Sequence, residues 1–388
     1  MKKIIIKILI FLIVMNIFPI SIFALENEEY ANITPNAYSA ILIEASTGKI
    51  LYNKNANEKH AVASLTKMMG LILIFEALEN DSLKLDEMIT TSRNAKEMGG
   101  SQIWLEEGEK ISVNDLIKGI TMASANDAMV LMAERLAGTE EAFVKLMNKK
   151  AKELGLKNTN FKNSTGLDEE GAYSSAYDMA IIAKNLLKHS KILDYTSVYE
   201  DYIRENTDNK TWIVNTNKLV RFYDGADGLK TGNDDEAGRC IAVTAKKDNL
   251  RLIMVSLGYK ESVDRNNEAM NLLDYGFNLY EANLLYKKGD IVGKTKLDKA
   301  TADEVELVLE EDILIVKKKS EENKTYDYKI KINELTYPIN KNDIIGKLEV
   351  REGNNLIKEV NLLSKEEIKK MNIIKLYFNT LIDTLTGV

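Results

Sequence analysis

Residues 64–79, with the sequence SLTKMMGLILIFEALE, constrain the fold of this chain more than any other segment. Their pattern predicts a helix that is apolar on nearly every side, and such a helix must lie inside a core. The segment is too short, and too interrupted by Lys67 and Glu76, to cross a membrane, which takes about 20 apolar residues. We therefore expect a block of helices packed around it, with Ser64 at its start.

Strand signals lie on both sides of this helical block. Residues 38–53 are typical of a β-hairpin, because two apolar runs flank the turn sequence Ser-Thr-Gly-Lys. Later strands are expected within 211–217, 240–247 and 250–259. Helices are expected over 112–121, 127–138, 140–154, 176–189 and 266–282. Strands that enclose helices in this order predict an α/β or α+β domain over about 30–282.

The pattern changes near residue 285. Apolar and charged residues alternate between turn signals, which predicts a small antiparallel β domain over 285–363. The tail, 364–388, has Ser364 as a candidate cap and apolar residues at spacings of three and four, with lysines early. It is predicted to be an amphipathic helix lying on a membrane surface. A helix packed back on its own domain is the alternative.

The N-terminus is typical of a secretory signal peptide. Lysines precede an apolar stretch that ends at Ala24, and acidic residues follow. We expect cleavage after Ala24, so that 1–24 is removed from an exported protein. Position –3 is Ile22 rather than a small residue, so an uncleaved membrane anchor is the alternative.

Charge and rare residues exclude several classes of function. Without Lys2, Lys3 and Lys7 of the signal peptide, the 52 basic residues become 49 against 59 acidic ones, a net charge of –10. An acidic chain without a basic patch argues against nucleic acid as a partner. The single Cys240 cannot form an internal disulfide, and the two histidines match no metal-binding spacing. No metal or other cofactor is therefore expected.

Ser64 and Lys67 are the first candidates for catalysis. A serine hydroxyl is a weak nucleophile that needs a neighbouring base, and residues three apart on a helix share one face. Burial would disfavour the charged form of Lys67, and the amides at a helix N-terminus could hold an oxyanion. The same spacing occurs in Ser-Thr-Gly-Lys at 46–49 of the predicted hairpin, so the spacing alone is not specific. A capping serine followed by a solvated lysine is the alternative.

Two further motifs follow in the chain. Ser124-Ala125-Asn126 falls in a break between two predicted helices, where side chains can point into a cleft. Lys230-Thr231-Gly232 precedes the strand segment that contains Cys240. A lysine and a hydroxyl at a strand edge can hold a substrate carboxylate, and Gly232 would let a ligand approach the backbone closely. Taken singly, the first motif is also typical of a turn and the second of a hairpin.

The order and separation of the three motifs resemble those of penicillin-recognising serine acyl-transferases. The chain is identified as a member of the low-molecular-mass penicillin-binding proteins of the serine-type D-alanyl-D-alanine carboxypeptidase family. The resemblance runs from about residue 33 to the tail, through ASLTKMM, GGSQIWLEEGE, SANDAMVLMAERLAG, FKNSTGLDEEGAYSSAYDMA, NTNKLV, DGLKTG and LLDYGF. It implies an α/β (α+β) transpeptidase/β-lactamase-like catalytic domain, a small all-β domain and an amphipathic membrane-surface helix.

The resemblance also implies the catalytic roles. Ser64 would be the acylated nucleophile, Lys67 the proton acceptor and Ser124 a proton relay. Asn126 would orient the substrate amide and Lys67. The backbone amides of Ser64 and Asn233 would form the oxyanion hole.

The remaining matches imply how substrate is held. Lys230, with Thr231 and Gly232, would bind a peptidoglycan stem peptide ending in D-Ala-D-Ala, and Arg265 would attract its terminal carboxylate. The same site would bind β-lactam antibiotics. The protein would act at the extracytoplasmic face of the cell membrane, as a peripheral protein.

Two departures from the family pattern stand out. The family usually follows Lys-Thr-Gly with an aromatic residue or histidine and then threonine, whereas this chain has Asn233 and Asp234. An aspartate in place of a hydroxyl would oppose a substrate carboxylate if the two meet. Ala172 stands where relatives often carry histidine, a change we expect to be tolerated.

Three other functions fit parts of the pattern. A D,D-endopeptidase that cuts peptidoglycan cross-links would use the same residues. A class A β-lactamase would need a deacylating glutamate in an E-x-x-L-N loop, and the nearest run, ELGLKN at 153–158, is misspaced. A catalytically weak cell-wall-binding relative is suggested by Asp234, but binding alone does not require the Ser64–Lys67 pair.

Overall fold

The computed structural model describes residues 32–298, 300–372 and 374. The predicted signal peptide at 1–24, and the predicted C-terminal helix from residue 375 onward, lie outside these described residues. Within the described ranges, no helix has the length and apolar character needed to cross a membrane.

The first part of the chain interleaves short strands with helices. In chain order its elements are β1 (Ser39–Glu44), β2 (Ile50–Lys54), the 3₁₀ helix η1 (Ala63–Thr66), α2 (Lys67–Glu79), β3 (Met88–Thr90), α3 (Arg93–Lys96), β4 (Lys110–Ser112), α4 (Val113–Thr121), α5 (Asn126–Ala137), α6 (Glu140–Glu153), α7 (Ala176–Leu186), η2 (Ser190–Ile192), α8 (Leu193–Thr196), β5 (Glu200–Ile203), β6 (Thr211–Val214), α9 (Leu219–Phe222), β7 (Ala226–Asp234), β8 (Gly238–Lys247), β9 (Leu250–Tyr259) and α10 (Ser262–Leu279).

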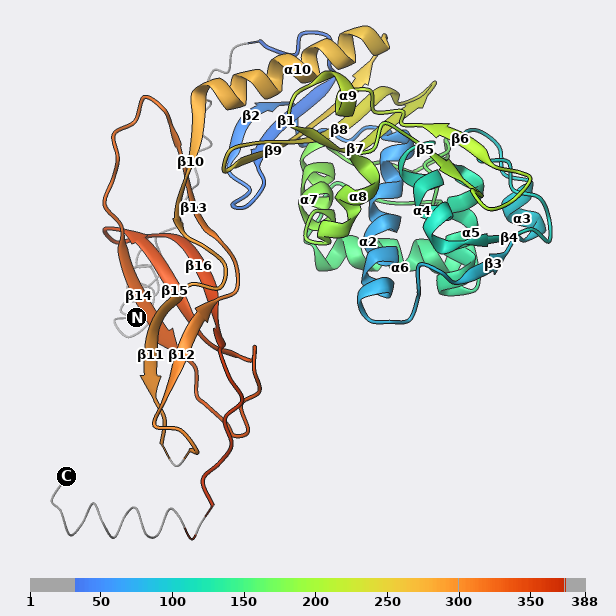
Figure 1. The fold of residues 1–388 in the computed structure, drawn as a ribbon. Coiled ribbons are helices and arrows are strands. Elements are labelled where there is room, and N and C mark those ends of the chain that lie inside the picture. Colours follow the sequence, from blue (N-terminus) through green and yellow to red (C-terminus); the bar gives the residue numbers. More distant parts are fainter. Residues whose placement is uncertain (1–31, 299, 373, 375–388) are drawn as a thin grey trace, which may run out of the picture. The chain divides into compact units, whose positions relative to one another are not determined.

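A five-stranded antiparallel sheet organises this part, with strand order β2-β1-β9-β8-β7. Helix α10 covers one face so closely that a β carbon on Gly276 would lie 2.6 Å from Leu252 Cδ1. The block of helices around α2 lies on the other face (Figure 1). Because both faces are covered, β1 is buried along its whole length. Strand β7 lies at one edge of the sheet, which leaves that edge available to the active site.

Helix α2 lies at the centre of the helical block, as predicted from its apolar sequence. A β carbon on Gly70 would lie 2.1 Å from Met129 Cε of α5, so these two helices pack in close contact. The expected start of the helix was wrong in detail, since Ser64 belongs to η1 and α2 begins at Lys67. Segments distant in sequence, such as β7, contact the turn around Ser64. The spacing of apolar residues along the chain does not indicate such contacts, so it did not predict where the helix begins.

The alternative Ser-x-x-Lys at residues 46–49 lies in the turn of the β1–β2 hairpin, as predicted. The backbone amides of Ser46 and Thr47 each donate a hydrogen bond to the carboxylate of Glu44, both at 2.7 Å. These contacts stabilise the turn, so this copy of the motif has a structural explanation.

The remaining strands are β10 (Tyr280–Tyr286), β11 (Ile291–Lys296), β12 (Glu304–Leu309), β13 (Ile313–Lys318), β14 (Asp327–Ile332), β15 (Ile344–Glu352) and β16 (Asn355–Ser364). Five of them form a sheet in the order β11-β12-β16-β15-β14, and β10 pairs with β13. The all-β character predicted for this part is confirmed.

The predicted helix does not begin at Ser364. Ser364 ends β16 and pairs with Leu307, and Ile368 forms a β-bridge with Ile339. Ile368 is only 1% exposed and packs in the core of the β domain. Its spacing fitted a helix face, but its backbone continues the strand pairing instead. Any helix in this tail therefore begins later.

Candidate active site

Ser64 and Lys67 are in direct contact. Lys67 is fully buried, and its Nζ donates hydrogen bonds to Ser64 Oγ at 2.8 Å and to the carbonyl oxygen of Thr165 at 2.7 Å. Side chains three apart in a 3₁₀ turn nearly eclipse one another. The turn η1 therefore aims the lysine back at the serine that precedes it.

The surroundings of Lys67 favour its neutral form. Burial lowers the pKa of Lys67 well below its usual value, and the nearby charge of Lys230 lowers it further. The carboxylate of Asp127 has a smaller, opposite effect on the same pKa. An uncharged amine in contact with a hydroxyl can accept its proton, so the pair has the chemistry of a nucleophile and its base.

Ser124 lies in the break between α4 and α5. Its φ of 62° is in the left-handed region, which is uncommon for a residue with a side chain. Hydrogen bonds on the following residues hold this conformation, from Ala125 N to Gly119 O at 3.0 Å and from Asn126 N to Ser101 O at 2.7 Å. The hydroxyl of Ser124 is thereby directed inward, where Lys230 Nζ donates to it at 2.7 Å.

Lys230 lies on the edge strand β7 and is 1% exposed. Its Nζ also donates to the carbonyl oxygen of Thr231 at 3.0 Å. Burial lowers the pKa of Lys230 to about 7, and the positive charge of Arg265 contributes. The amine therefore changes charge near neutral pH and can respond to an anionic ligand.

Gly232 brings β7 against the Ser64 turn. A β carbon at Gly232 would lie 2.8 Å from the carbonyl oxygen of Val62 and 3.2 Å from Ala63 Cβ. We expected Gly232 to let a ligand approach the backbone closely, but the group that lies against it is the Ser64 turn of the protein itself. Any larger residue would push apart the strand that carries Lys230 and the turn that carries Ser64.

The other residues of the third motif differ in their surroundings. Thr231 is 6% exposed, and its Oγ1 donates to Thr216 Oγ1 at 2.9 Å. Asn233 is exposed at the end of β7. Arg265 lies in the first turn of α10, where its guanidinium donates to Asn266 Oδ1 at 2.9 and 3.1 Å. It is 7% exposed, and its positive charge lowers the pKa of Lys230.

Asn126 is placed by the loop between α3 and β4. Its Nδ2 donates to the carbonyl oxygen of Gly99 at 2.7 Å. Its Oδ1 is buried and has no hydrogen-bond partner within the described part of the chain. An unpaired buried acceptor costs free energy, so a ligand N–H would be favoured at this position. No hydrogen bond joins Asn126 to Lys67 among the described residues.

Two contributors to the site were not predicted. Thr165 supplies a backbone carbonyl to Lys67, and no side-chain pattern reports such a role. Asp127 accepts the backbone amides of Ile103 and Leu105, and burial raises its pKa. Burial of Asp127 could have been predicted from the sequence, because this residue directly follows the Ser-x-Asn motif and would be buried together with it.

Asp234 contacts protein groups rather than the lysine pair. Its Oδ1 accepts the backbone amide of Ala237 at 2.5 Å and closes the β7–β8 turn. Burial and the nearby carboxyl group of Asp168 raise the pKa of Asp234 to about 6. The two carboxyl groups lie at a small cavity beside the Ser64 turn. The repulsion that we expected between Asp234 and a substrate carboxylate is therefore present between Asp234 and the carboxyl group of Asp168.

We expect Asp234→Asn to be more stable than the parent above pH 6, by about 1 kcal/mol for a partly exposed carboxylate screened by solvent. The pKa is higher in the folded chain than its usual 3.8, so the carboxyl group favours folding below pH 4 and loses this contribution as pH rises through about 6. Asparagine keeps the acceptor for Ala237. Thermal unfolding from pH 4 to 8 measures the difference, with exposed Asp235→Asn as control. Parallel curves for both variants would contradict the expectation.

The single cysteine and the two histidines have structural surroundings of their own. Cys240 is fully buried, and burial raises the pKa of its thiol to about 12. His60 stacks on Tyr38 and His189 pairs with Glu79, so the described residues form no Ser-His pair at Ser64. The described ranges also contain no group of three or more histidine, cysteine or acidic residues arranged to hold a metal ion.

Family models match both parts of the chain. The model described as D-alanyl-D-alanine carboxypeptidase matches residues 26–261. The model described as the C-terminal domain of penicillin-binding protein 5 matches residues 280–370.

Individual proteins are similar over nearly the same extent. D-alanyl-D-alanine carboxypeptidase DacF from Bacillus subtilis is 46% identical over 384 residues, which cover 99% of each chain. DacA from Escherichia coli is 32% identical and covers 90% of this chain and 86% of its own.

Solved structures agree with these relatives. Penicillin-binding protein 5 from Haemophilus influenzae has a TM-score of 0.67 and 28% identity, covering 86% of this chain and 98% of its own. A peptidoglycan synthesis regulatory factor (PBP3) from Streptococcus pneumoniae has a TM-score of 0.68 and 27% identity, covering 86% and 99%.

Proposed function

The chain belongs to the D-alanyl-D-alanine carboxypeptidase family of low-molecular-mass penicillin-binding proteins, and we propose that Ser64 is its acylated nucleophile. It is a serine-type carboxypeptidase with a penicillin-recognising catalytic domain and an all-β C-terminal domain. One observation supports the assignment of Ser64 most directly: a fully buried lysine lies 2.8 Å from its hydroxyl. A binding module has no need of such a pair.

In the first step Ser64 Oγ attacks the carbonyl carbon between the last two D-Ala residues. Lys67, as a neutral amine, accepts the hydroxyl proton, and the carbonyl oxygen becomes an oxyanion. The backbone amides of Ser64 and Asn233 are the proposed donors to this oxyanion. The carbonyl of Thr165 supports the resulting ammonium of Lys67, since it already accepts a hydrogen bond from Nζ.

In the second step the C–N bond breaks and terminal D-Ala leaves as an amine. Its nitrogen needs a proton, which Ser124 relays from the Lys67 ammonium. The contact from Lys230 Nζ to Ser124 Oγ orients that hydroxyl. Water then attacks the carbonyl carbon of the acyl-enzyme ester, and Lys67 accepts the proton that the water loses. The bond between that carbon and Ser64 Oγ breaks, Lys67 returns the proton to Ser64 Oγ, and the shortened peptide leaves.

Substrate binding is proposed for the residues around this pair. Lys230 and Thr231 hold the terminal carboxylate at the free edge of β7, and the charge of Arg265 attracts it. Asn126 Oδ1, buried and without a partner among the described residues, accepts an amide N–H of the peptide. Gly232 lets β7, which carries Lys230, lie directly against the turn that carries Ser64.

We assign as substrate the peptidoglycan stem peptide that ends in D-Ala-D-Ala, outside the cytoplasm. β-Lactams would acylate the same serine. Release of D-Ala from a D-Ala-D-Ala pentapeptide tests the proposal. A cross-linked peptide dimer tests the second candidate, a D,D-endopeptidase. Cleavage of the dimer at a higher kcat/KM than the pentapeptide would favour the endopeptidase, and failure on both would overturn the proposal.

We expect a chain lacking residues 373–388 to be released from membranes. The tail from residue 375 lies outside the described residues and has the apolar spacing of a membrane-surface helix. The truncation must leave Ile368 in place, because Ile368 is in the core of the β domain. Sedimentation with membrane vesicles measures attachment, with full-length protein as control. Unchanged attachment would instead indicate the N-terminal apolar stretch.

A further inference from the structure

The two tryptophans of the chain both lie on the surface. The side chain of Trp104 is 73% exposed and that of Trp212 is 57% exposed, although tryptophan is among the more buried residue types on average. Trp212 lies directly opposite Tyr202 across the β5–β6 pair, and Tyr202 is 41% exposed. We call Trp104, Tyr202 and Trp212 the aromatic rim.

The β5–β6 hairpin presents its aromatic side outward because its other side is needed for the core. Ile203 and Ile213 alternate with the aromatic residues along the strands and are buried. The rings on the outer side therefore have a packed base beneath them. Lys210 places its Nζ 4.1 Å from the centroid of the Tyr202 ring, so the rim has charged groups at its margin.

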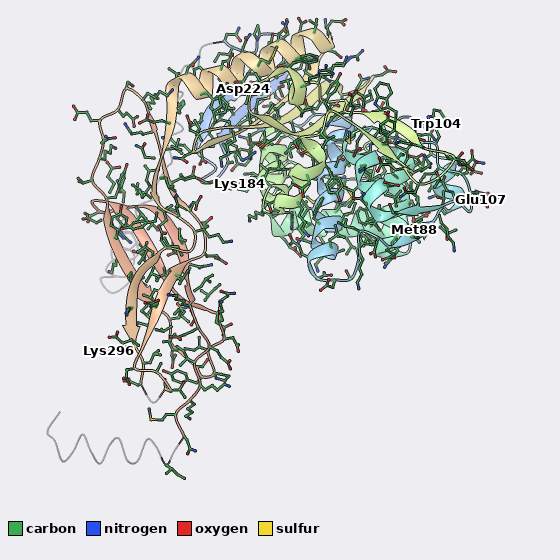
Figure 2. The ribbon with its side chains drawn as sticks, viewed as in Figure 1. Met88, Trp104, Glu107, Lys184, Asp224 and Lys296 are labelled. Atoms are coloured by element: carbon green, nitrogen blue, oxygen red, sulfur yellow. The ribbon has the colours of Figure 1, made fainter. Side chains whose placement is uncertain are left out.

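Trp104 is held in an exposed position by a buried network. Its φ of 59° is strained for a bulky residue. Arg204, itself buried, donates to the carbonyl oxygens of Ile103 at 3.1 Å and Trp104 at 3.4 Å. It also donates to Thr211 Oγ1 at 3.3 Å, in the residue before Trp212. This network joins the backbone of the Trp104 loop to the hairpin. Figure 2 shows Trp104 at the outer edge of the catalytic part of the chain.

Both elements of the rim are linked through the chain to residues of the proposed site. The loop before Trp104 holds Asn126 through the carbonyl oxygens of Gly99 and Ser101. Beyond Trp212, the chain continues to Thr216, which accepts the hydrogen bond from Thr231. Short stretches of chain therefore join the rim to residues that are proposed to bind the peptide.

We propose that the aromatic rim binds the glycan strands of peptidoglycan while the attached stem peptide occupies the site. Flat exposed rings stack on the apolar faces of sugar rings, and charged neighbours such as Lys210 can hydrogen-bond to sugar hydroxyls. A protein partner would favour a larger continuous apolar patch, whereas the charged Lys210 lies against the Tyr202 ring. The inference rests on the proposed function, because it assumes that the stem peptide is delivered on its polymer.

The test compares a soluble pentapeptide with intact, insoluble peptidoglycan. In a Ser64→Ala background, Trp104→Ala with Trp212→Ala is expected to weaken cosedimentation with peptidoglycan at least fivefold. Soluble glycan chains without peptides should compete with the insoluble peptidoglycan for binding to the Ser64→Ala protein. With Ser64 intact, D-Ala release from the pentapeptide should stay within twofold of the parent. Phe222→Ala, which removes a 64% exposed ring outside the rim, is the matched control.

Each outcome separates this inference from the proposed function. Unchanged cosedimentation of the double variant would overturn the glycan assignment and leave a protein partner as the explanation for the rim. An equal loss on pentapeptide and polymer would overturn it too, by assigning the tryptophans to the peptide site. A parent enzyme that fails on the pentapeptide would instead overturn the proposed function. Trp104→Phe with Trp212→Phe, expected to retain most binding, controls for folding.

Discussion

Ser64→Ala is expected to lower D-Ala release from a D-Ala-D-Ala pentapeptide by on the order of 10⁴-fold or more, since no acyl-enzyme can form without the nucleophile. Covalent attachment of labelled penicillin should disappear in the same variant. Folding should be little affected, because the change removes one hydroxyl that contacts Lys67. Steady-state D-Ala release and gel detection of the label provide the two measurements.

Ser46→Ala is the matched control for this experiment. Ser46 has the same spacing to a lysine but lies in the hairpin turn, where its hydroxyl donates to Glu44 at 3.0 Å. We expect this variant to retain both D-Ala release and labelling. Penicillin labelling that survives Ser64→Ala would refute the assignment of the nucleophile, whatever the activity.

Lys67→Ala is expected to slow acylation by about 10²–10⁴-fold, the range for loss of a general base. The low pKa of Lys67 makes it the neutral acceptor that Ser64 requires, and the variant leaves only water in its place. It also leaves the carbonyl of Thr165 without its donor, which we expect to cost about 1–3 kcal/mol of stability. Stopped-flow acylation by a chromogenic β-lactam, at a temperature where both forms are folded, measures the rate.

A base that is missing can be partly replaced from solution. Added methylamine should therefore restore part of the acylation rate of Lys67→Ala and leave the parent unchanged. Lys49→Ala, in the hairpin copy of the motif, should acylate normally. If Lys67→Ala acylates at the parental rate, the proton acceptor lies elsewhere and the proposed mechanism is wrong.

The sequence predicted the side chains of the site better than their surroundings. Ser64 and Lys67 were expected to meet, and the structure brings them within 2.8 Å. Ser124 and Lys230 were expected at the same site from motif order, and their direct contact at 2.7 Å was not predicted. The central helix followed from its apolar sequence, because burial on all sides is encoded locally. Asp234 stood out in the sequence as a departure from the family pattern, and in the structure its carboxyl group lies near that of Asp168.

Long-range contacts account for what the sequence did not predict. The carbonyl of Thr165 reaches Lys67 from a loop far along the chain, and backbone atoms carry no residue-type signal. The neighbour of Asp234 was unpredictable for the same reason, since Asp168 belongs to that loop region. Ile368 fitted a helix by spacing but joined a strand from another segment. Periodicity reports local geometry, whereas these features depend on which segments meet.

The buried thiol of Cys240 has a practical consequence for spectroscopy. It is the only cysteine in the chain, fully covered, and its high pKa keeps it protonated at neutral pH. Maleimide reagents require an accessible thiolate, so the native protein should remain unlabelled. A single cysteine introduced at an exposed position such as Asp235 would then carry the only fluorophore, without prior removal of the native one. The distance between that fluorophore and an acceptor in vesicles could follow the enzyme as it approaches a membrane.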